Sequence, residues 1–212
     1  MAHKVHPKGF RVGISENWKS IGFSKKRYKR WIREDVKIRD FLKKNFKKGI
    51  IQDVRIERSG NETKISIFSS RPGFLIGREG GGVEKISKKI AALVKSKKVK
   101  VNIEELKIPE QNAIFIAQQI ARDLESRIPY RKTAKKALDK IFSQKGAEGA
   151  KIILKGRLDG TEIARKETFK MGKLPSQTIR SNIDYAQESA FCYYGIVGIK
   201  VWIYKGKKEG KI

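Results

Sequence analysis

The sequence Gly77-Arg78-Glu79-Gly80 has the pattern G-x-x-G, follows a short apolar run and precedes a helical pattern. Glycines at both ends of the loop let the backbone approach a bulky ligand closely. The helix that follows directs unpaired N–H groups and the positive end of its dipole toward the same place. This arrangement favours a phosphate backbone, although a G-x-x-G sequence also occurs in ordinary turns. No Gly-Lys-Ser/Thr follows, which excludes a nucleotide-binding P-loop.

The charge balance indicates a polyanionic partner. Lysine and arginine number 50 against 22 aspartates and glutamates, which gives a net charge of +28. Nucleic acid fits this excess better than an anionic membrane does, and charge alone fits DNA as well as RNA. The apolar runs are far shorter than the ~20 residues of a membrane span, and the N-terminus has no apolar signal core. Cys192 is the only cysteine, so we expect no internal disulfide and a reducing compartment.

The hydrophobic periodicity of the first half predicts a leading helix, a hairpin, the G-x-x-G loop between two helices, and a final strand. This order resembles the type II KH domain, an RNA-binding module whose G-x-x-G loop clamps the nucleic-acid backbone. The resemblance implies a three-stranded sheet with helices on one face, and RNA contact by Gly77, Arg78, Glu79 and Gly80. The predicted domain covers residues 18–108, with helices over 24–47 and 81–95 and strands over 50–57, 64–68 and 98–106.

The second half, residues 109–205, predicts a separate α+β domain with two helices packed on an antiparallel sheet. Asp159-Gly160 is a hairpin signal, and the strands around it place a basic row on one sheet face, namely Lys151, Lys155, Arg157, Arg165 and Lys170. The predicted elements are helices over 110–127 and 130–143, strands over 150–157, 161–169, 179–185 and 196–204, and a helical turn over 187–193.

The helix over 130–143 has two contrasting faces. One is apolar, and the other carries the pairs Arg131/Lys135 and Lys132/Lys136 at a spacing of i,i+4. Like charges at that spacing weaken a helix by a few tenths of a kcal/mol each, and bound phosphates relieve the repulsion. By charge alone, a solvated lysine-rich face and an RNA-binding face explain this strip equally well.

Several segments resemble signatures of the bacterial small-subunit ribosomal protein three family. They cover the whole chain in the family's order: residues 4–14, 34–39, the KH segment, 156–167, 178–185 and 194–206. The resemblance implies a place on the head of the small subunit, bound to its large 16S-type RNA and lining the channel through which mRNA enters. The family's positively charged channel helix matches Arg131, Lys132 and Lys135 here, with Lys136 beside them. It also implies contacts with small-subunit proteins ten and fourteen, in cytoplasmic ribosomes of bacterial or organellar type.

Other function classes find little support in the sequence. A helicase would need a nucleotide-phosphate loop and a nuclease clustered carboxylates, so we expect no enzyme, cofactor, metal or small-molecule substrate. The main alternative is a free KH-domain RNA chaperone or translational regulator. Residues 1–17 and 206–212 are predicted to be basic tails, the first of which orders on contact with a partner. Further candidates for RNA contact are Lys4, Lys8, Arg11, Arg157, Arg165 and Lys166.

Overall fold

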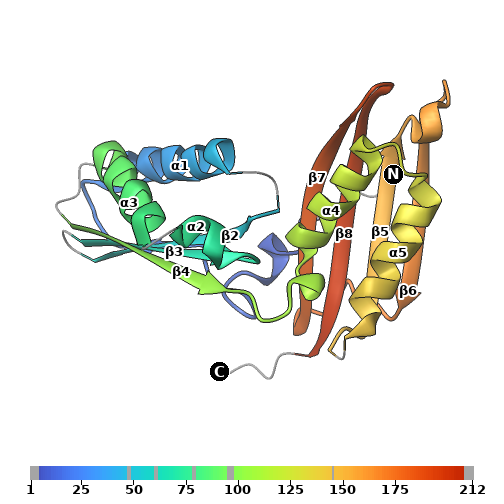
Figure 1. Cartoon of the computed structure of the whole chain (residues 1–212). Helices are drawn as coiled ribbons and strands as arrows, with labels where there is room; N and C mark the ends of the chain where they lie inside the picture. Colours follow the sequence, from blue (N-terminus) through green and yellow to red (C-terminus); the bar gives the residue numbers. More distant parts are fainter. Residues whose placement is uncertain are drawn as a thin grey trace. The chain divides into compact units, whose positions relative to one another are not determined.

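A computed structural model describes residues 5–46, 49–59, 62–77, 80–94, 98–144 and 146–207. The chain divides into two compact units, Trp18–Lys107 and a second unit that combines Met1–Asn17 with Ile108–Ile212. Each unit consists of one sheet with helices on one of its faces (Figure 1), which confirms the predicted α+β class. Within the described ranges, no helix is both long and apolar enough to cross a bilayer.

The sheet of the first unit has four strands in the order β1-β2-β3-β4, one more than predicted. The additional strand is β1, a short exposed segment parallel to β2 that carries no alternating pattern. Ile38, Leu42 and Ile90 of the helices pack on Ile65 and Ile67 of the sheet, and all five are buried. The elements are β1 Ser20–Gly22, α1 Tyr28–Asn45, β2 Ile51–Ser59, β3 Glu62–Ser69, α2 Pro72–Ile76, α3 Gly81–Leu93 and β4 Lys98–Glu105.

A buried carboxylate joins α1 to the sheet of the first unit. Glu34 accepts hydrogen bonds from Arg30 and from Arg58 of β2, each at 2.8 Å. Arg58 also donates to Asp35 at 2.6 Å, and its guanidinium lies over the Trp31 ring. Burial opposes ionisation of Glu34, but the two arginines more than compensate and lower its pKa. Part of the charge of this basic chain therefore stabilises the fold and does not face a ligand.

The sheet of the second unit is antiparallel, in the order β6-β5-β8-β7, and α4 and α5 cover one of its faces (Figure 1). The structure contradicts the helical turn predicted over 187–193, because β7 continues without a break to Cys192. Ala186 and Ala190 of β7 are buried in the core with α4, and such small residues gave little strand signal. The elements are α4 Ala113–Glu125, α5 Tyr130–Ser143, β5 Gly149–Gly156, β6 Arg165–Gly172, β7 Ser181–Cys192 and β8 Gly195–Lys207.

The described part of the N-terminal segment, residues 5–17, belongs to the second unit and makes hydrogen bonds within the chain, which the sequence did not predict. Arg11 is only 1% exposed. Its guanidinium donates to the carbonyl oxygens of Pro7, Ser176, Thr178 and Ser181 at 2.9–3.0 Å, and to the Ser181 hydroxyl at 3.0 Å. Because most of these partners lie more than 160 positions away, the sequence does not distinguish Arg11 from a cation on the surface.

Asp184 of β7 fastens the same segment to α4. Its carboxylate lies 2.7 Å from Lys8 Nζ and accepts the backbone N–H of Ala113, the first residue of α4, at 2.9 Å. Lys205 lies 3.9 Å away. Burial opposes ionisation of Asp184, but the two lysines and the backbone hydrogen bond outweigh it and lower the pKa of this carboxyl. Asp184 therefore stays charged at neutral pH and connects the N-terminal segment, α4 and β8.

Candidate nucleic-acid interface

The cationic strip on α5, defined as Arg131, Lys132, Lys135 and Lys136, is exposed over the first two turns of the helix. The opposite side of α5 anchors the helix on the sheet, with Ala134, Ile141 and their neighbours buried in the core. Because residues at i and i+4 share a face, this anchoring directs all four cations to solvent. Their exposed arrangement can contact several phosphates of one strand.

The strip contains one oriented arginine and three lysines. Arg131 Nε donates to the Tyr130 hydroxyl oxygen at 3.0 Å, and the guanidinium lies over the Tyr130 ring. This hydrogen bond raises the pKa of Arg131 above its ordinary value. Among the described residues, no carboxylate forms an ion pair with Lys132, Lys135 or Lys136. Their charge is therefore available to an external anion.

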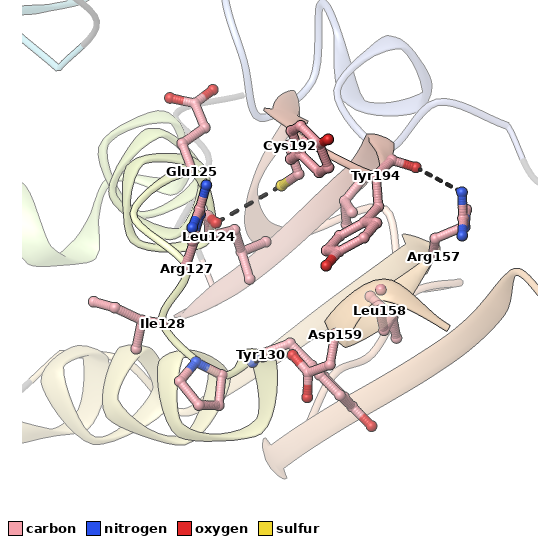
Figure 2. Close-up of a pocket in the computed structure, with 14 residues that line it drawn as sticks. Leu124, Glu125, Arg127, Ile128, Tyr130, Arg157, Leu158, Asp159, Cys192 and Tyr194 are labelled. Atoms are coloured by element: carbon pink, nitrogen blue, oxygen red, sulfur yellow. Dashed lines mark hydrogen bonds between the residues drawn. The ribbon is translucent and has the colours of Figure 1, made fainter. Parts of the chain in front are cut away.

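A pocket of about 460 Å³ opens beside the start of α5. Figure 2 shows its lining, contributed by the α4–α5 connection and by the turns that follow β5 and β7. Arg157 donates to the carbonyl oxygens of Thr161 at 2.9 Å and Tyr194 at 3.4 Å, and lies over the Tyr194 ring. Gly160 has a φ of +80°, and a Cβ there would meet the Tyr194 ring at 2.9 Å. The sequence pattern gave no sign that the exposed Tyr194 lines a pocket.

The G-x-x-G loop connects the end of α2 to the start of α3. Gly77 and Gly80 have φ angles of +70° and +77°, a region that favours glycine. A Cβ on Gly82 would lie 2.3 Å from the carbonyl oxygen of Leu75, so this glycine lets the first turn of α3 pack against α2. Arg78 and Glu79, also predicted to contact RNA, lie outside the described residues. Both described glycines of the motif therefore have a backbone conformation that most other residues would strain, and neither has a side chain that would keep a ligand away.

The structure describes five of the six remaining candidates for RNA contact. Lys8 and Arg11 are used inside the protein, by Asp184 and by the carbonyl oxygens around Ser181, so the buried Arg11 guanidinium has no access to RNA. Arg157 lines the pocket, and Arg165 and Lys166 are exposed on opposite faces of β6. The sequence predicted Arg165 on the same sheet face as Lys151, Lys155 and Lys170, and the strand register contradicts this by placing Arg165 on the opposite face. Lys4 lies outside the described residues.

Comparison with known proteins agrees with this architecture. Residues 37–111 match a family model described as KH domain, and residues 120–203 match one described as Ribosomal protein S3, C-terminal domain. The protein named Small ribosomal subunit protein uS3 is 47% identical in Persephonella marina, over 98% of this chain and 92% of that protein. The uS3 of Pseudothermotoga lettingae is 42% identical, over 99% of this chain and 100% of that protein. The chain belongs to the uS3 family of ribosomal proteins and is of the bacterial type.

Proposed function

We propose that the protein is a structural constituent of the small ribosomal subunit and that its α5 strip holds mRNA where mRNA enters the subunit. The name of the relatives supports the first part, since it assigns them to that subunit. The observation that carries the second part is the set of four exposed cations on one side of α5. Their contacts are to phosphates, which hold a strand without reading its sequence. That property is required of a surface that meets every message in turn.

The proposed partners follow from the same assignment. The large RNA of the subunit, of 16S type, is the polyanion that the net charge of +28 requires. Small-subunit proteins ten and fourteen are the proposed protein neighbours, and the cytoplasmic ribosome is the proposed location. The protein contributes binding and positioning, and no chemical step is assigned to its residues.

The assignment to the ribosome is tested by sedimentation. A tagged copy of the chain should co-sediment with small subunits through a sucrose gradient at moderate salt, in stoichiometric amount. A free RNA chaperone of the KH class would instead remain near the top of the gradient, since exposed electrostatic contacts weaken steeply as salt rises. Recovery of the tagged protein only in the light fractions would contradict the assignment.

The G-x-x-G loop is expected to contact RNA backbone, and Gly80 offers a matched pair of substitutions. A Cβ at this position meets nothing within 4 Å, and Asn and Asp tolerate positive φ better than other side chains. Gly80→Asp adds a negative charge, whereas Gly80→Asn adds nearly the same shape without charge. We expect Gly80→Asp to weaken RNA protection around this domain by roughly fivefold, about the effect of removing one phosphate interaction.

The footprint of assembled subunits measures this effect. The Asn variant should keep most of the protection, because its side chain fits the same open space. Equal protection in the Asp variant, the Asn variant and the unaltered protein would show that the loop is structural only.

A further inference from the structure

We propose that the face of the second sheet opposite α4 and α5 binds the phosphate backbone of a second RNA segment, distinct from the mRNA on the α5 strip. This open face follows from the strand register. Ile152, Leu154, Val201 and other alternate residues are buried with the helices, so their neighbours along each strand face the other way. The proposal depends on the chain working in an RNA particle but not on the function of α5.

Five lysines occupy this open face: Lys151, Lys155, Lys166, Lys170 and Lys200. Four of them form two pairs in which one lysine lies directly opposite the other on the neighbouring strand: Lys151 with Lys170, and Lys155 with Lys166. Like charges in such positions destabilise a sheet. A bound polyanion removes this repulsion, so the arrangement favours a charged partner over bare solvent.

Within the described strands β5 to β8, the open face carries no aspartate or glutamate. Among the described residues of β5 to β8, every aspartate and glutamate falls on the helix-covered face in the strand register, as Glu167, Asp184 and Glu188 illustrate. No ion pair joins Lys155, Lys166, Lys170 or Lys200 to any described carboxylate. Neighbouring strands lie about 4.8 Å apart, and the two lysine pairs are separated by about 13 Å along the strands. The charges therefore extend over several successive phosphates.

The aromatic residues of the open face also fit RNA. Trp202 is partly exposed, with Lys151 Nζ 5.7 Å from its ring centroid and the Tyr185 ring at 5.0 Å. His6 packs edge-on against Tyr185, so the N-terminal segment closes one side of the face. Lysine is depleted at protein–protein interfaces relative to the rest of the surface, whereas arginine and aromatic residues are enriched there. A lysine field beside one tryptophan is accordingly more typical of a nucleic-acid surface than of a protein surface.

The sheet separates the two cationic surfaces of this unit. The α5 strip faces solvent on the helix side, and the five lysines face away from the helices. A single extended strand cannot lie on both without passing around the edge of the sheet. The second segment is therefore assigned to structured RNA of the particle itself, which could hold this unit in place while mRNA moves along α5.

A photoreactive amino acid at Thr168 tests this inference in assembled small subunits. Thr168 is exposed on β6 between Lys166 and Lys170, and its replacement removes no charge. We expect irradiation to form an adduct with RNA that does not require mRNA. An adduct with protein alone, or none, would overturn the proposal, and an adduct with mRNA alone would assign the face to the message instead.

A charge-removal variant gives an independent readout. Replacing Lys155, Lys166, Lys170 and Lys200 by glutamine should make the protein dissociate from subunits at lower salt, with at least about a tenfold loss of RNA affinity at fixed salt. Unwinding of mRNA per occupied subunit should remain unchanged. Loss of the α5 strip should instead slow unwinding and leave the salt resistance of binding to the subunit unchanged. The melting temperature of the free variant should equal or exceed that of the unaltered protein, since repulsion is relieved. Unchanged salt resistance in a folded variant would contradict the proposal.

Discussion

Small subunits whose α5 strip is replaced by alanine at all four positions are expected to unwind base-paired mRNA at least about tenfold more slowly. The strip is proposed to hold the mRNA strand while its base pairs open. For each single-strand phosphate that the strip no longer neutralises, the slope of the logarithm of the binding constant against the logarithm of salt concentration falls by about 0.7. The helix itself should survive, because alanine is the best helix former and the repulsive i,i+4 pairs disappear. The rate of unwinding of a defined hairpin, followed by fluorescence in assembled subunits, measures the effect.

The control removes the same charge from α1. Four lysines of that helix are exposed, and their replacement by alanine should leave the unwinding rate within about twofold. A conservative Arg131→Lys variant should retain most of the rate, losing only the planar geometry of the guanidinium. Equal loss in both quadruple variants would indicate a general effect of charge and would contradict a specific strip. The four control positions are Lys29, Lys37, Lys43 and Lys44.

Arg11→Met is expected to lower the free energy of unfolding of the second unit by about 3 kcal/mol. Methionine can occupy the space of the arginine stem, but it leaves the surrounding carbonyl oxygens without their donor in a buried site. A buried acceptor left without its donor costs about 1–3 kcal/mol, so the loss from several such carbonyl oxygens is of this size. The N-terminal segment should become sensitive to protease at the same time, because Arg11 is its most buried anchor.

Chemical denaturation followed by circular dichroism measures this stability change. Arg165→Met is the matched control, since Arg165 is exposed and should shift stability by no more than about 0.5 kcal/mol. Arg11→Lys should fall between the two, because it keeps the charge but cannot donate to all the same acceptors. An Arg11→Met variant as stable and as protease-resistant as the Arg165→Met variant would contradict the anchoring role.

Elements with a clear periodic pattern could be predicted from the sequence. The bounds of α5, residues 130–143, agree with the structure because its apolar spacing is regular and Pro129 precedes it. The exposure of the α5 strip followed from the same pattern, since a helix that buries one face must present the other to solvent. The order of elements in the first unit was sufficient for the KH resemblance, which the family comparison supports.

Features that depend on contacts between distant residues could not be predicted. Arg11 and its partners near Ser181 are separated by 170 positions, and the bond between Glu34 and Arg58 joins a helix to a strand. In a chain with 50 lysines and arginines, a structural cation has no local signal that separates it from an RNA-binding one. The strand β1 was missed for a related reason, because its three exposed residues have no buried side to create alternation.

A photoreactive amino acid at Asp139 in assembled subunits tests whether the α5 strip contacts mRNA. Asp139 is exposed on α5 one turn beyond Lys135 and on the same line as Arg131. If the α5 strip holds mRNA, irradiation should form an adduct with mRNA that extends far enough downstream, and a shorter message should give none. Adducts only with ribosomal RNA or protein, at any message length, would contradict the assignment of this helix to mRNA.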